Sequence, residues 1–143
     1  MPDRKPTVPV KLEHIHTPTA ADWQDLEKIH QDTSATGFAA DRSALEQWLA
    51  DGGWIIAGRF NDRLIGALLA QETPAGVMLS QAGVRSVTQR RGVMHQMLHF
   101  IQRWAQEEGK TLVVRDCPEN LQPALQHRGF MAADGELQYR HNG

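Results

Sequence analysis

Two apolar runs joined by a two-residue turn place the strongest limit on how this chain folds. The segment Trp54–Glu72 reads WIIAGRF, then Asn61-Asp62, then RLIGALLAQE. Asn and Asp tolerate the positive φ angles that a two-residue hairpin turn requires, and apolar runs of this length are typical of buried strands. The sequence therefore predicts an antiparallel β-hairpin inside a sheet that has at least one buried face.

Strands and helices flank this hairpin in a regular order. Alternation predicts a strand over 10–15, with Val10, Leu12 and His14 on one side. Thr19, with Asp22 three residues later, and Asp41 are typical of the residues that begin helices. Further along we expect a strand over 77–87 with a bulge at Ala82-Gly83, a helix from Gly92 to Gly109, a strand over 111–117, a helix ending at Gly129 and a strand over 136–140.

The long helix predicts how the second half of the chain is connected. Its apolar face is expected to hold Met94, Leu98, Ile101 and Ala105, and its polar face His95, His99, Gln102 and Gln106. A helix between two strands is typical of a parallel crossover, here between Val84 and Asp116. We therefore expect an α/β (α+β) fold with a mixed, mostly antiparallel sheet and helices on both faces.

Composition limits the classes of function. The chain has 143 residues, a formal net charge of −2 and a pI of about 6.4, which disfavours a nucleic-acid partner. Its single cysteine, Cys117, fits a reducing compartment, and no signal peptide or apolar run long enough to span a membrane is evident. We expect a loose lead over 1–9, one domain over 10–143, and a cytoplasmic location with no membrane partner.

A basic turn precedes the long helix, and it predicts an anion site. The stretch VRSVTQRRGVM places Arg90, Arg91 and Gly92 at the point where the helix begins. Unpaired N–H groups and the helix dipole favour an anion there, and glycine lets the backbone approach it closely. A solvated basic loop is the alternative explanation of the same pattern.

The same turn resembles the acyl-coenzyme A loop of the GNAT acetyltransferase superfamily. QRRGVM has Gln89, Gly92 and Met94 at the three defining positions of the motif Q/R-x-x-G-x-G/A, and ENLQPALQHRGF resembles the helix ending in Gly-Phe that closes GNAT domains. The resemblance covers residues 10–141 and implies the GNAT fold, with a splayed pair of parallel strands. It implies acetyl-CoA (coenzyme A) as ligand, bound by Val84, Val87, Gln89, Arg90, Arg91, Gly92, Val93 and Met94.

Three longer strings point to one branch of this superfamily. DLEKI, AGRFNDRLIGA and VRSVTQRRGV are similar to strings of small GNAT-like proteins that bind acetyl-CoA and then the aspartate α-decarboxylase proenzyme, promoting its self-cleavage. The resemblance implies the same regulatory role and partner here. Arg59 and Asn61, at the hairpin tip, are the candidate partner contacts.

The proton carriers of a GNAT transferase are missing from their usual positions. Leu125 stands where the superfamily has a tyrosine, and residues 77–87 contain no carboxylate. Asp116 as base and Cys117 as acid are the nearby substitutes. This pattern favours ligand sensing over turnover. The alternatives are an N-acetyltransferase acting on a small amine or a protein N-terminus, and a fold that binds a protein partner without coenzyme.

A metal site is not expected. His95 and His99 have the spacing of a zinc pair on a helix, but no acidic ligand accompanies them, and a solvated face explains them better.

Overall fold

The computed structural model describes residues 9–33, 37–85, 92–115, 117, 121–133 and 135–140. Eleven helices and strands are assigned within these ranges. In chain order they are β1 (Lys11–Ile15), α1 (Ala20–Thr33), α2 (Arg42–Ala50), β2 (Trp54–Phe60), β3 (Arg63–Thr73), β4 (Gly76–Val84), α3 (Val93–Glu108), β5 (Leu112–Val114), α4 (Gln122–His127), β6 (Met131–Ala133) and β7 (Glu136–Tyr139).

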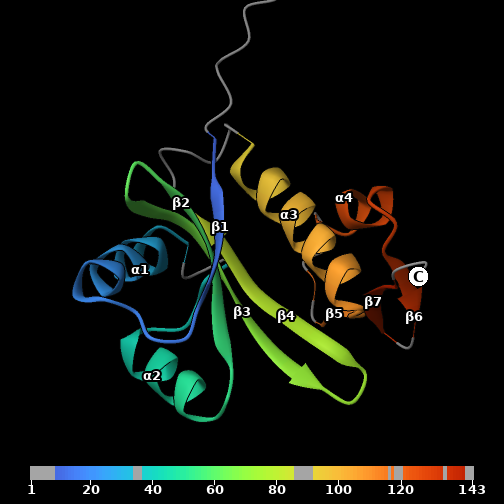
Figure 1. The fold of residues 1–143 in the computed structure, drawn as a ribbon, viewed down its shortest axis with the longest axis horizontal. Coiled ribbons are helices and arrows are strands. Elements are labelled where there is room, and N and C mark those ends of the chain that lie inside the picture. Colours follow the sequence, from blue (N-terminus) through green and yellow to red (C-terminus); the bar gives the residue numbers. More distant parts are fainter. Residues whose placement is uncertain are drawn as a thin grey trace, which may run out of the picture.

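All seven strands form one mixed sheet, in the order β1-β2-β3-β4-β5-β7-β6. The β4–β5 pair is parallel and the other neighbouring pairs are antiparallel. Helices α1 and α2 lie over one face of the sheet and α3 and α4 over the other (Figure 1). The predicted mixed sheet with helices on both faces is confirmed.

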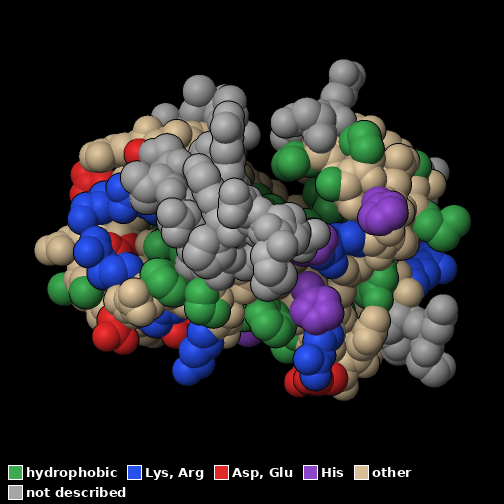
Figure 2. All heavy atoms as spheres, turned by 90° about the horizontal axis from the view of Figure 1, so that it is seen from above, with side chains coloured by type: hydrophobic (Ala, Val, Ile, Leu, Met, Phe, Trp, Pro, Cys, Tyr) green, Lys and Arg blue, Asp and Glu red, His purple; other side chains and the backbone are tan. Residues whose placement is uncertain are grey.

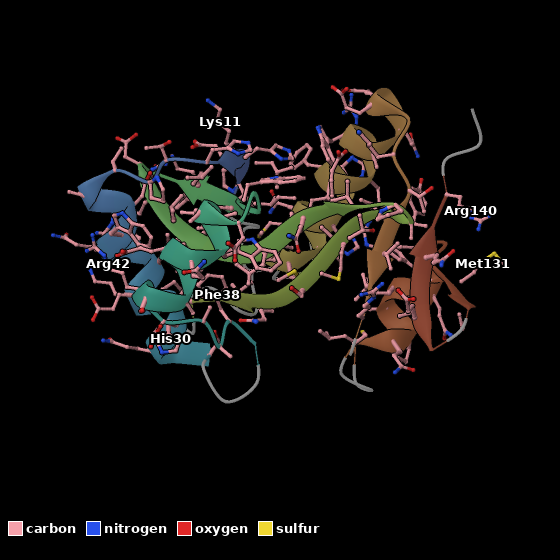
Figure 3. All side chains as sticks on the ribbon, turned by 90° about the horizontal axis from the view of Figure 1, so that it is seen from below. Lys11, His30, Phe38, Arg42, Met131 and Arg140 are labelled. Atoms are coloured by element: carbon pink, nitrogen blue, oxygen red, sulfur yellow. The ribbon has the colours of Figure 1, made fainter. Side chains whose placement is uncertain are left out.

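Two apolar clusters fill the spaces between the helices and the sheet. Alternate residues of β2 separate to the two faces: Ile55 joins the cluster under α1 and α2, and Ile56 joins the one under α3 and α4. Figure 3 labels Phe38, which is fully buried in the cluster under α1 and α2. It also labels Met131, which lies on the outermost strand, β6, and has an exposed side chain.

The local signals at helix starts and at the hairpin turn are confirmed. Thr19 Oγ1 accepts a hydrogen bond from Asp22 N–H at 3.1 Å, and Asp22 Oδ2 accepts one from Thr19 N–H at 3.2 Å. Asp41 Oδ1 caps α2 by accepting from Ala44 N–H at 2.9 Å. In the hairpin, Asn61 and Asp62 have φ angles of 48° and 62°, as a two-residue turn requires.

The predicted apolar face of α3 is only partly right. Val93, Met97, Ile101, Gln102 and Ala105 are the buried residues, whereas Met94 and Leu98 are half-buried. The stripe runs at i, i+4 from Val93, so the helix is rotated slightly from the predicted position. Gln102 is buried although it was assigned to the polar face, because Arg128 satisfies its amide: Nε2 donates to Arg128 O at 2.9 Å.

The strands differ from the prediction in one additional strand and in the extent of another. Strand β6 was not predicted, because three residues between Phe130 and the final turn give no periodic signal. Strand β4 ends at Val84, and the predicted continuation to residue 87 lies outside the described residues.

Small residues in the hairpin bring α3 close to the sheet. A Cβ atom on Gly66 would lie 2.8 Å from Met97 Sδ, and one on Gly58 would lie 3.3 Å from the same sulfur. The first turns of α3 can therefore rest directly on β2 and β3, which places the start of this helix beside the end of β4.

Candidate functional site

Strands β4 and β5 separate partway along β4. Their parallel register covers only Val77–Leu79 against Leu112–Val114, and β4 continues to Val84 after β5 has ended. A bulge on β4 bends the strand over this stretch: Gln81, with φ 53°, and Ala82 together face the single β3 residue between Ala67 and Leu69. This is the splayed parallel pair that the resemblance implied, and it leaves a wedge between the two strands.

The start of α3 closes the wide end of this wedge. Gly92 is the N-cap residue, with φ 73° and ψ 19° in the left-handed region, and no side chain caps the helix among the described residues. A residue with a Cβ atom would be strained in this conformation. An anion beside Gly92 would meet helix N–H groups and the positive end of the helix dipole.

Val93 and Met94 play different parts at this helix start. Val93 is fully buried in the core, so only its backbone can face a ligand. Met94 lies within the first helical turn, is half-buried, and packs against the cluster beneath α3. It therefore occupies helical backbone without positive φ, and its departure from the Gly or Ala of the motif adds side-chain bulk but no backbone strain.

Five predicted site residues lie outside the described part of the chain. They are Val87, Gln89, Arg90, Arg91 and Asp116.

Hydrogen bonds from two directions hold α3 in place. Gln96 Oε1 accepts from Val10 N–H at 3.0 Å, which ties the first turn to the start of β1. On the other side, Arg128 Nη2 donates to His95 O at 3.0 Å and Nη1 donates to Gln102 Oε1 at 3.1 Å. This Arg128 clamp joins α4 to α3. No local pattern could have revealed it, because Gln102 and His95 lie 26 and 33 residues before Arg128 in the sequence.

Arg59, a predicted partner contact, is held within the protein. Its Nε donates to Glu13 Oε2 at 2.6 Å, and its Nη2 donates to Glu13 Oε1 at 3.1 Å and to Asp22 Oδ1 at 3.0 Å. The hydrogen bonds to Glu13 raise the pKa of Arg59, and those to Asp22 add to the effect against the opposing cost of burial. The guanidinium therefore links the hairpin to β1 and α1.

A second ion pair connects the hairpin to α1. Asp25 is 2% exposed, and its Oδ1 accepts from Arg63 Nε at 2.9 Å and from Nη2 at 2.7 Å. Its Oδ2 accepts from the buried Leu64 N–H at 3.0 Å. Asp25 belongs to the string DLEKI and Arg63 to AGRFNDRLIGA, so two of the three family strings contact each other here.

Asn61 is exposed at the hairpin tip, at the same end of the sheet as the wedge. Strands β2 and β4 both run antiparallel to β3, so both finish at the same end of the sheet. Their last residues, Phe60 and Val84, pair with Arg63 and Gly66 of β3. Figure 1 shows this tip and the start of α3 at one end of the molecule.

The tyrosine that usually acts as general acid has no counterpart at its position, and Cys117 is the one predicted proton carrier among the described residues. Leu125 is 6% exposed and packs in the core. Tyr139, the one tyrosine in the sequence, lies opposite Leu112 on β7, away from the wedge. Cys117 is half-buried, and burial raises the pKa of its thiol, so it stays protonated at neutral pH.

The described ranges meet neither the requirements of a metal site nor those of a membrane-spanning helix. There, no group of three or more His, Cys, Asp or Glu side chains is arranged to hold a metal ion. No helix there has both the length and the apolar character needed to cross a bilayer.

The wedge, the left-handed glycine and the crossover helix together define a GNAT-type domain, and solved structures share this fold. YhhK from E. coli, solved with coenzyme A bound, is 24% identical, covers 92% of this chain and 98% of its own, and has a TM-score of 0.65. A GNAT family acetyltransferase from Brucella melitensis, solved with acetyl-CoA, is 10% identical, with 93% and 90% covered and a TM-score of 0.65.

The family itself follows from the sequence comparison. Residues 9–142 match the family model described as acetyltransferase (GNAT) domain, PanZ, and the chain belongs to the PanZ family. A PanD regulatory factor from Salmonella typhimurium is 34% identical over 84 residues. That match spans 59% of this chain and only 57% of the relative's length.

Proposed function

We propose that this protein is an acetyl-CoA sensor that, once loaded, binds the aspartate α-decarboxylase proenzyme and promotes its maturation. Family membership supports the regulatory role, because the matched Salmonella relative is named a PanD regulatory factor. Coenzyme A and acetyl-CoA in two proteins of the same fold support the ligand. The observation that carries the proposal is the wedge where β4 continues beyond its pairing with β5 at Leu79, beside a helix start at Gly92 that no side chain of the described residues caps.

Different parts of the coenzyme bind the helix start at Gly92 and the wedge between β4 and β5. We expect its pyrophosphate to take the backbone N–H groups that lead into α3, with Gln89, Arg90, Arg91, Gly92, Val93 and Met94 as the residues of that set, whereas Val84 and Val87 belong to the part that meets the pantetheine. The pantetheine chain runs along the edge of β4 that β5 leaves after Leu79, with its amides bonding to the strand as an added strand would. Main-chain groups therefore supply most of the binding.

The partner contacts the end of the molecule where the hairpin tip and the wedge meet. Asn61 offers an exposed side chain there, while Arg59 positions the tip through Glu13 and Asp22. A surface that includes both the tip and the filled wedge would make partner binding depend on coenzyme.

Co-purification with the decarboxylase proenzyme, with and without acetyl-CoA, tests the proposal. We expect recovery of the proenzyme to require acetyl-CoA in the wild type and to be lost in Gly92→Val, because the added side chain fills the anion position. Strain in the left-handed region costs about 1–2 kcal/mol for an ordinary side chain and more for the β-branched valine, and circular dichroism checks that the variant remains folded. Equal recovery with and without acetyl-CoA would contradict the sensor.

The contact at the tip is tested by Asn61→Gly. Glycine keeps the positive φ of the turn and removes only the side chain, so the fold and acetyl-CoA binding should be unchanged. We expect weaker capture of the proenzyme by this variant. Unchanged capture would move the partner contact away from Asn61.

Acetyl transfer is the second candidate, and the protonated Cys117 thiol favours it, since a neutral thiol can donate a proton to a leaving thiolate. Asp116 would then act as base. A thiol-release assay over a panel of amines and peptide N-termini separates the two functions: the sensor predicts no release above hydrolysis, and release lost in Cys117→Ala would establish transfer.

A further inference from the structure

Four basic side chains gather where α3 and α4 meet, beside the start of α3. His95 lies in the first turn of α3 and His99 one turn later, and both are exposed. His127 is the last residue of α4, and Arg128 follows it. Figure 2, which looks onto this end of the molecule, shows histidine side chains close to basic ones on the half that carries α3 and α4.

The Arg128 clamp fixes this cluster. Its guanidinium donates to His95 O and to Gln102 Oε1, and its own carbonyl accepts from Gln102 Nε2. The two helices are thereby held in one arrangement, with the imidazoles of His95 and His127 on the outer surface. The backbone from which these side chains project is therefore fixed, so less of the site has to become ordered when a ligand binds.

The electrostatic surroundings of His95 are positive. Burial, followed by the charges of Arg128, His99 and His127, lowers the pKa of His95. Among the described residues, the charged groups that act on His95 from α3 and α4 are all cationic. Like charges held together destabilise the empty protein, and an anion placed among them removes that cost.

We propose that His95, His99, His127 and Arg128 form a binding site for a phosphate monoester, and that the 3′-phosphate of the coenzyme occupies it. This inference rests on the proposed coenzyme site. With pantetheine along β4 and pyrophosphate at Gly92, the nucleotide end must leave the wedge over the outer side of α3. His95, three residues beyond Gly92, is the first exposed basic side chain there.

The ligand chemistry follows from the donors. A phosphate monoester carries close to two negative charges at neutral pH and three acceptor oxygens, which suit the ring N–H donors of several histidines and a nearby guanidinium. A carboxylate has half that charge and fewer acceptors. Protonation of His95 and phosphate binding should therefore strengthen each other.

The test compares acetyl-CoA with 3′-dephospho-acetyl-CoA by calorimetry on wild type, His95→Gln and Arg103→Gln. Arg103 is the matched control, because it is an exposed cation two turns further along α3. Loss of the 3′-phosphate should weaken wild-type binding about five- to tenfold near pH 6.5, and about twofold or less in His95→Gln. Arg103→Gln should behave as wild type.

An NMR titration of the imidazoles gives a second readout. Acetyl-CoA should raise the pKa of His95, while the dephospho ligand should leave it nearly unchanged. Equal affinity for the two ligands, or a His95 pKa that ignores the 3′-phosphate, would overturn this inference alone. A pKa rise with inorganic phosphate but not with acetyl-CoA would overturn the coenzyme as the source. Absence of binding by either coenzyme form would remove the proposed function as well.

Discussion

Removal of the Asp25 carboxylate should be among the most damaging changes in the α1 half of the protein. Asp25→Ala leaves the N–H of Leu64 buried without its acceptor, which costs about 1–3 kcal/mol. The lost ion pair with Arg63 adds only a small further loss, because half of the Arg63 side chain is in water. We expect the free energy of unfolding to fall by about 3 kcal/mol and the melting temperature by roughly 10 °C.

Urea denaturation of Asp25→Ala beside Glu27→Ala measures this loss. Glu27 is an exposed carboxylate on the same helix, and its removal should change stability by less than about 0.5 kcal/mol. A loss in Asp25→Ala no greater than that of the control would refute the assignment of Asp25 as the residue that locks the hairpin to α1.

The same carboxylate should make stability depend on acid. Burial by itself would raise the pKa of Asp25, but hydrogen bonds from Arg63 and Leu64 and the charge of Arg63 outweigh it, so the pKa lies below its ordinary value. Its contribution is therefore complete above the ordinary pKa of an aspartate and is lost as pH falls through the lowered value. The stability gap between wild type and Asp25→Ala should narrow in strong acid. A difference in the free energy of unfolding that stays constant with pH would contradict a lowered pKa for Asp25.

Three further outcomes follow from the packing and the ligand site. Gly66→Ala should cost about 1–3 kcal/mol in chemical denaturation and weaken acetyl-CoA binding, since the new methyl group displaces the buried Met97 at the foot of α3. Gln102→Ala should cost about 2 kcal/mol in the same assay, because Arg128 loses both its acceptor and its donor. In a thermal melt, acetyl-CoA at a hundred times its dissociation constant should stabilise the wild type by about 2.7 kcal/mol, and no shift would count against the coenzyme site.

Local chemistry made much of the fold predictable. The caps at Thr19 and Asp41 and the Asn61-Asp62 turn each depend on residues a few positions apart, and such patterns are visible in sequence. The crossover helix between two apolar runs likewise predicted the parallel pair. The bulge predicted at Ala82-Gly83 lies one residue earlier, at Gln81 and Ala82, because Gly83 still pairs with Ala67.

Long-range partners could not be predicted in the same way. Arg59 stands in an exposed-looking turn sequence, yet Glu13 and Asp22 hold it from 46 and 37 residues away. Gln102 has a polar side chain, and only the arrival of Arg128 makes its burial favourable. Among site residues, the position of Gly92 followed from its motif, whereas the His95 cluster needed the meeting of two helices.

The central claim is that coenzyme pyrophosphate binds the N–H groups at the start of α3. Titration of isotope-labelled protein with acetyl-CoA, followed by amide chemical shifts, tests it most directly. The largest saturable shifts should belong to Gly92 and Val93, with Val84 at the end of β4 also affected. Saturable shifts confined to the groove between β1 and α3, around Leu12 and Trp104, or none at millimolar ligand, would contradict the account.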